Sequence, residues 1–182
     1  MTTKREQTRS RILQAAWQLF QEQGYQNSST RAIARTAGVA DGTVFSHFKT
    51  KLDMLKAGIL VQVDTVVAEA DRLLRANTPE QRLLHYASHL YPLYAECAEF
   101  SRELFKELLW DQQELRPQIQ AFIDKLFADK PSEDDRLYGQ ILMDLYFMTL
   151  LEGLGERTCD SDRMLAQLGA KLDYMSRAQS AT

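Results

Sequence analysis

The sequence predicts an all-α fold. Glycine and proline are scarce, with 8 and 4 residues among 182, and few segments alternate apolar and polar residues with the period of two that favours strands. Apolar residues instead return every three or four positions, which is the spacing of one helix face. We therefore expect about nine helices: a three-helix head, a long connecting helix, and an α-helical body.

The first helix is predicted over residues 4–23. Its apolar face contains Ile12, Leu19 and Phe20, which recur at helical spacing. Gly24 follows at a position suited to a left-handed C-cap. The segment therefore has a buried side and a defined end.

Two short helices joined by a tight glycine turn are predicted next. Ser28 or Ser29 offers an N-cap for the first of them, and Gly38 breaks it. Asp41 is the best capping residue for the second, which we place at about residues 41–48. Two short helices with such a turn form a helix-turn-helix unit.

The remaining residues divide into six further helices. Thr78 is expected to cap the second of these and Ser132 the fifth, while Pro92 should kink the second. Gly153 and Gly155 mark the end of the fifth. The six helices are predicted at residues 51–75, 79–97, 99–112, 114–128, 133–155 and 161–177.

Charge is distributed unevenly along the chain. Residues 1–56 contain nine basic and four acidic side chains, a net charge of +5. Because the whole chain carries −3, the remainder carries −8. A basic head on an acidic body is typical of a protein that binds a polyanion through the head.

The segment from Gly24 to Leu55 resembles the head of the TetR family of bacterial transcription regulators. The resemblance rests on an ordered series of matches spread over some thirty residues. These are Gly24-Tyr25, Ser28-Ser29, Arg31, Ile33-Ala34, Ala37-Gly38-Val39, Gly42-Thr43, Phe45, His47-Phe48 and Lys51. The resemblance implies a helix-turn-helix DNA-binding domain at residues 1–50 and an effector-binding and dimerisation domain at residues 51–182.

The resemblance also implies which residues lie at double-stranded operator DNA: Ser29, Arg31, Asp41, Gly42, Thr43, Phe45, Ser46, His47 and Lys51. Arg31 is the expected base reader, because its guanidinium can engage guanine through two hydrogen bonds. His47 and Lys51 are expected at backbone phosphates. Two positions depart from the family pattern. Ala40 replaces the usual serine, which moves the cap to Asp41, and Phe45 replaces a frequent tyrosine.

The resemblance further implies a homodimeric repressor that a small-molecule effector releases from DNA. The last two helices, residues 133–155 and 161–177, carry the apolar stripes that suit a dimer interface, although both stripes could instead close a monomeric core. Aromatic and methionine residues of the middle helices are candidates for the effector pocket, with one histidine as a polar contact; their alternative is an ordinary core. These candidates are His89, Tyr91, Tyr94, Phe105, Trp110, Met143 and Phe147.

Two other functions are compatible with parts of the sequence. A protein of the same fold could control chromosome organisation or division through a protein partner, without a small-molecule pocket. A helical metal-dependent enzyme could use His85 and His89, which lie one turn apart, but no third ligand and no activated nucleophile is evident. We expect neither catalysis nor a metal or cofactor.

The cellular location is predicted from two features of the sequence. Cys97 and Cys159 lie far apart without CxxC spacing, and no apolar segment of about 18 residues is present. We therefore expect a cytoplasmic protein that does not enter the membrane.

Overall fold

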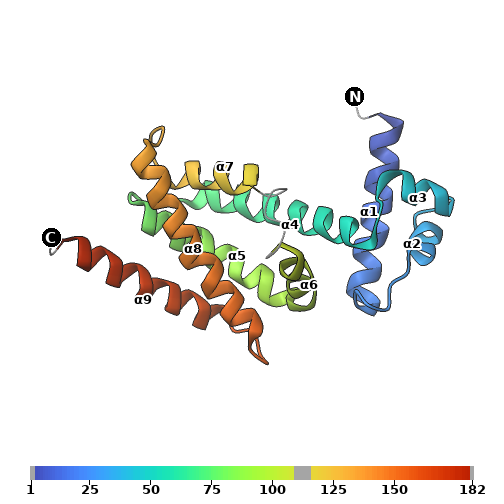
Figure 1. The fold of residues 1–182 in the computed structure, drawn as a ribbon. Helices are drawn as coiled ribbons and strands as arrows, with labels where there is room; N and C mark the ends of the chain where they lie inside the picture. The colour runs from blue at the N-terminus through green and yellow to red at the C-terminus, as the bar shows by residue number, and fades with distance from the viewer. Residues whose placement is uncertain (1–2, 109–115, 181–182) are drawn as a thin grey trace. The chain divides into compact units, whose positions relative to one another are not determined.

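A computed structural model describes residues 3–108 and 116–180 of the chain (Figure 1). These residues form nine helices and no strand, which confirms the all-α prediction. The helices are α1 (Lys4–Gln23), α2 (Thr30–Thr36), α3 (Asp41–His47), α4 (Lys51–Leu73), α5 (Pro79–Glu96), α6 (Ala98–Leu108), α7 (Arg116–Leu126), α8 (Glu133–Gly155) and α9 (Ser161–Ser180).

The chain divides into two compact units, Met1–Asp64 and Thr65–Thr182. The first unit contains α1, α2, α3 and the N-terminal part of α4, and the second contains the rest. The domain boundary predicted after residue 50 stays a prediction. Among the described residues, no helix is both long and apolar enough to cross a membrane.

Helix α1 has the bounds that the sequence predicts. Thr3 and Glu6 form a reciprocal capping box, in which each side chain accepts a hydrogen bond from the other residue's backbone N–H. Gly24 ends the helix at φ 81°, a backbone angle that favours glycine. The apolar face of α1, including Ile12 and Phe20, is buried in the first unit.

Helices α2 and α3 form the predicted helix-turn-helix. Ser29 caps α2 by accepting a hydrogen bond from the Ala32 backbone N–H, and Gly38 turns the chain at φ 64°. Ile33 and Val44 are fully buried. These apolar residues of two seven-residue helices hold the motif together, because helices this short are not stable alone.

The second unit is built around α5. This helix packs against α6, α7, α8 and α9, and α8 in turn packs against α9; Figure 1 shows these helices side by side. Thr78 caps α5 and Pro79 occupies its first turn, as predicted, and the helix runs on through Pro92 to Glu96. The buried core of this unit therefore lies between α5 and its neighbours.

Helix α8 has the bounds 133–155 that the sequence predicts. Ser132 caps it as predicted, Asp135 completes a capping box with Ser132, and the helix passes through Gly153 and ends at Gly155. A side chain at Gly153 would collide with Met164 of α9. Gly153 therefore permits the close packing of α8 on α9, and Gly155 is the glycine that ends the helix.

The first turn of α6 is attached to two neighbouring elements. The buried Ser101 hydroxyl donates to the Tyr94 carbonyl of α5 at 3.1 Å. The Arg102 guanidinium donates to the Leu154 carbonyl at 2.7 Å and to the Glu156 carbonyl at 3.1 Å, at the C-terminal end of α8. Arg102 therefore stabilises the negative end of the α8 dipole while fixing α6.

Candidate functional site

Helix α3 has one buried face and one accessible face. Val44 and Phe48, at its end, are buried, whereas the Phe45 side chain is 52% exposed. Gly42 and Ser46 are exposed beside Phe45. A phenylalanine with half of its side chain exposed is available to contact an apolar group such as a thymine methyl.

The structure pairs Arg31 of α2 with Asp41 of α3. Arg31 Nε lies 3.6 Å from Asp41 Oδ2, and both side chains are exposed. The helix N-cap is Ala40, which makes no side-chain hydrogen bond. The prediction that Asp41 caps α3 was therefore wrong: Asp41 is the first helical residue, and its carboxylate faces Arg31 instead.

The Arg31–Asp41 pair has a consequence for DNA binding. An isolated carboxylate at the start of α3 would repel phosphate, and the nearby Arg31 guanidinium offsets part of that repulsion. The same pairing holds the guanidinium beside the exposed face of α3. Arg31, the expected base reader, and Asp41, whose charge opposes phosphate binding, therefore lie side by side.

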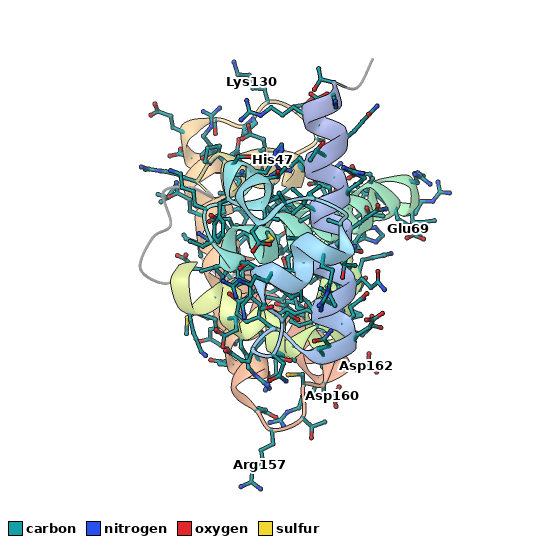
Figure 2. All side chains as sticks on the ribbon, turned by 90° about the vertical axis from the view of Figure 1, so that its right-hand side faces the viewer. His47, Glu69, Lys130, Arg157, Asp160 and Asp162 are labelled. Atoms are coloured by element: carbon teal, nitrogen blue, oxygen red, sulfur yellow. The ribbon has the colours of Figure 1, made fainter. Side chains whose placement is uncertain are left out.

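Ser29, Thr43 and His47 lie in the helix-turn-helix in different surroundings. Ser29 is exposed and its hydroxyl caps α2. Thr43 is half-buried, and its carbonyl accepts the Ser46 hydroxyl at 2.7 Å. His47 is half-buried at the last position of α3 (Figure 2). Their roles at DNA stay predictions.

Lys51 has partners within the protein. Its ammonium group donates to the backbone carbonyls of Tyr25 at 2.6 Å, Ser28 at 3.1 Å and Gln26 at 3.4 Å. It also lies 4.2 Å from the centre of the Tyr25 ring. Lys51 therefore ties the start of α4 to the loop before α2, a positioning role that the sequence did not reveal.

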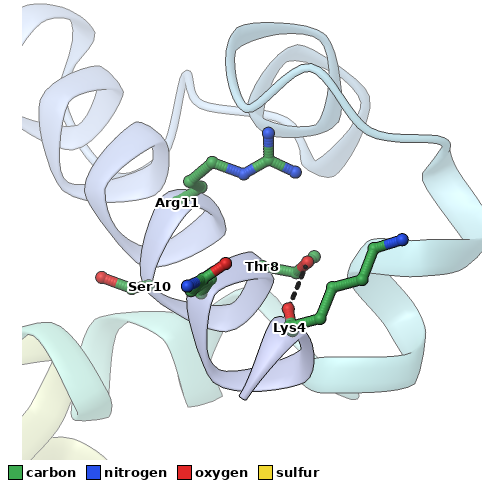
Figure 3. A pocket seen from close by; sticks show the side chains of 5 residues that line it. Lys4, Thr8, Ser10 and Arg11 are labelled. Carbon is green, nitrogen blue, oxygen red and sulfur yellow. Dashed lines mark hydrogen bonds between the residues drawn. The ribbon is translucent and has the colours of Figure 1, made fainter. Parts of the chain in front are cut away.

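Basic side chains of α1 add to the charge of the head. Lys4 and Arg11 border a polar hollow on the surface of α1, together with Thr8 and Ser10 (Figure 3). The Arg9 guanidinium lies over the Phe48 ring, 4.6 Å from its centre. The exposed cations Lys4 and Arg11 therefore remain suited to attract a polyanion at long range.

The aromatic candidates of the body meet in one cluster. The Tyr94 ring contacts the Phe105 ring at 5.8 Å between centroids, and the Phe105 ring contacts the Phe147 ring at 6.2 Å. Tyr91 stacks on Tyr146 at 5.0 Å, and Tyr146 contacts Phe147 at 5.3 Å. We call these five residues the aromatic cluster; it joins α5, α6 and α8.

Other candidates lie differently. Met143 is buried in α8. His89 is half-buried, and its Nδ1 lies 2.9 Å from the His85 carbonyl and 3.1 Å from the Ser88 hydroxyl. Trp110 lies outside the described residues. No group of three or more His, Cys, Asp or Glu side chains in the described residues is arranged to hold a metal ion.

Tyr146 was missed among the candidates, although it lies at the centre of the aromatic cluster. Its signal in the sequence was a tyrosine within an otherwise apolar part of α8. Burying a phenol places a hydroxyl in the core, where it requires a hydrogen-bond partner. That signal is weak, because many core tyrosines find a backbone carbonyl, as Tyr91 does with the carbonyl of Tyr146 at 2.9 Å.

Comparisons with known proteins agree with the fold and with the head. Residues 12–57 match the family described as bacterial regulatory proteins, tetR family. The transcriptional repressor KstR of Mycobacterium tuberculosis is 28% identical over 166 residues, which cover 85% of this chain and 74% of KstR.

Two solved structures have a similar fold. A TetR transcriptional regulator from Rhodococcus superposes with a TM-score of 0.74 at 19% identity, covering 93% of this chain and 96% of that one. The Thermus thermophilus repressor FadR, solved with lauroyl-CoA, superposes with a TM-score of 0.62 at 24% identity, covering 91% of both chains.

The accessible face of α3, the basic head and the all-α body all agree with these matches. The family match covers the helix-turn-helix itself, and the similarity to KstR extends into the body. Residues 12–57 form a helix-turn-helix like that of the tetR family, and the chain is a DNA-binding transcriptional regulator similar over 85% of its length to the repressor KstR.

Proposed function

We propose that the chain is a homodimeric repressor that binds operator DNA through α2 and α3 and leaves it when an apolar small molecule binds the body. The exposed Phe45 is the observation that carries the DNA contact, since the apolar residues Val44 and Phe48 beside it are buried. The relatives named as repressors support the direction of regulation.

The DNA contact is tested by removing Phe45. Preferred duplexes are first selected from a random pool with the wild-type protein, and binding is then measured by fluorescence anisotropy. Phe45→Ala should weaken binding by about tenfold, because one good base contact is worth roughly 1–3 kcal/mol. Val61→Ala is the control, because Val61 of α4 is 51% exposed. Equal binding by both variants and the wild type would contradict the interface.

The dimer is proposed from the surface of the last two helices. Seven large apolar side chains of the described residues are exposed, and four of them lie on α8 and α9. On α8, Leu137, Ile141 and Met148 recur at spacings of four and seven, which places them on one side. Tyr174 of α9 is 71% exposed. An exposed apolar surface of this kind is typical of a subunit interface.

Light scattering tests the dimer. We expect the mass of two chains for the wild type and of one chain for Ile141→Asp, since a carboxylate in an apolar interface would be buried without a partner. Leu73→Asp, at an exposed position at the end of α4, should remain dimeric. A wild-type monomer at micromolar concentration would overturn this part of the proposal.

The effector is proposed to act by population shift, binding the form that does not bind DNA more tightly than the form that does. Acyl thioesters, aromatic acids and sterols are suitable probes, because the aromatic cluster offers apolar walls. A compound that raises the melting temperature should also release selected DNA. If none does and the protein occupies many genomic sites, the predicted alternative of a factor acting through a protein partner is favoured.

A further inference from the structure

The Tyr146 hydroxyl is the exceptional polar group of the aromatic cluster. The side chain is 2% exposed, and its hydroxyl makes no hydrogen bond within the part of the chain that the structure describes. The neighbouring Tyr94 hydroxyl contributes to raising the pKa of Tyr146, but the two hydroxyls do not meet in hydrogen-bonding geometry. Tyr91, which stacks on Tyr146, does have a partner, the Tyr146 carbonyl.

A buried hydroxyl without a partner is costly to the folded protein. The hydroxyl has lost its hydrogen bonds to water and has gained none in exchange. Native cores contain few such groups, and each needs a reason. A ligand that accepts a hydrogen bond from this hydroxyl would recover the lost free energy. The hydroxyl would therefore contribute to the affinity for that ligand.

The surroundings determine which ligand group fits. Burial raises the pKa of Tyr146 and of Tyr91, and it raises the pKa of Tyr94 to about 12, so all three hydroxyls are protonated donors at neutral pH. A carboxylate would be desolvated by the same environment that disfavours phenolate. An uncharged acceptor avoids that cost, and a carbonyl oxygen is the usual acceptor for O–H.

The side chains around the Tyr146 hydroxyl determine what the rest of the ligand must be. Tyr91, Tyr94 and Phe105 are buried around Tyr146, and Phe147 is half-buried. Their rings present apolar surface, so the body of the ligand must be apolar. Phe147 is the member of the aromatic cluster with most access to solvent.

We propose that Tyr146 recognises the effector by donating a hydrogen bond to an uncharged carbonyl group attached to an apolar chain or ring, as in a thioester, ester or ketone. The inference rests on the proposed effector function and names the chemistry of that site. It predicts that the hydroxyl destabilises the empty protein and stabilises the occupied one.

The first test compares Tyr146→Phe with Tyr91→Phe by thermal unfolding without ligand. Tyr146→Phe removes an unpartnered hydroxyl, so the melting temperature should rise by roughly 2–8 °C. Tyr91→Phe is the matched control in the same stack and removes a satisfied hydrogen bond, so its melting temperature should fall. A fall for Tyr146→Phe would show that its hydroxyl already has a partner and would overturn the proposal.

The second test uses two matched pairs of probes, lauroyl-CoA against S-dodecyl-CoA and 2-undecanone against 1-undecene. The wild type should bind the carbonyl member of at least one pair about tenfold more tightly, and Tyr146→Phe should lose that preference. Failure of both carbonyl probes to bind, or equal binding of the two members, would overturn the proposal.

The unfolding and probe-binding measurements are made without DNA, so their results do not depend on whether the probe releases DNA. A protein that binds the carbonyl probes but keeps its DNA would contradict the repressor mechanism and leave the Tyr146 site standing. If a compound of another class releases the protein from DNA and the protein shows no preference for carbonyl probes, the Tyr146 site is contradicted. The repressor mechanism is then supported.

Discussion

Replacing Lys51 by alanine would show whether this residue holds the head together or contacts DNA directly. The family resemblance implies a phosphate contact, whereas in the structure the ammonium group donates to the backbone carbonyls of Tyr25, Gln26 and Ser28. The two roles have different consequences for stability and for the salt dependence of binding.

The magnitude follows from the contacts. A hydrogen bond from a charged group is worth about 1.5–3 kcal/mol when well formed, and a cation over an aromatic ring adds roughly 0.5–1 kcal/mol near the surface. Lys51 is half-buried, and its contact with the Gln26 carbonyl is long at 3.4 Å. We therefore expect a loss of about 2–3 kcal/mol, which lowers the melting temperature by roughly 5–10 °C.

The assay combines circular dichroism melts with DNA anisotropy at several salt concentrations. Lys49→Ala is the control, because it removes the same charge from an exposed neighbouring position. For Lys51→Ala we expect a lower melting temperature and weaker binding with an unchanged salt slope. A wild-type melting temperature together with a salt slope reduced by about 1 would refute the positioning role and support a phosphate contact.

Three further predictions concern single residues. Ala40→Ser supplies the missing cap of α3 and should stabilise the protein by about 0.5–1 kcal/mol, seen as a higher melting temperature; no change would mean that the cap cannot form. Arg31→Ala and Asp41→Ala should be non-additive in DNA affinity, with a coupling of roughly 0.5–1 kcal/mol in a double-mutant cycle, and additive effects would separate the pair. Burial opposes ionisation of Asp71, but hydrogen bonds from Lys125 and Tyr86 outweigh it and lower its pKa in the folded protein. The stability that this carboxylate contributes is therefore present above the ordinary aspartate pKa and is lost as the pH falls through the lowered pKa. The melting temperature of Asp71→Asn should therefore depend less on pH in acid than that of the wild type. An unchanged pH dependence would show that Asp71 is not the source of this stability.

Local features of the fold could be predicted from the sequence. The ends of α1, the cap at Thr78 and the cap at Ser132 depend on residues within four positions of one another, so the pattern alone identifies them. The ordered motif around Gly38 identified the helix-turn-helix in the same way. All-α architecture followed from the repetition of such local signals.

Features that depend on distant residues could not be predicted. The packing role of Gly153 is hidden in the sequence because its neighbour, Met164, belongs to another helix. Asp41 looks like a cap because nothing local shows that Arg31 of α2 lies beside it. Lys51 finds its carbonyl partners more than twenty residues earlier. Each error or omission arose where a tertiary contact changed the role that local chemistry suggests.

The two attachments of α6 decide how the aromatic cluster could open. Ser101 and Arg102 fix the first turn to α5 and to the end of α8, whereas Phe105 lies one turn further along the helix. Lifting Phe105 from Tyr94 would therefore tilt α6 about a hinge at its first turn. The work of opening is then done against a few ring contacts, while the hydrogen bonds at the hinge persist and return the helix to its place once the ligand leaves.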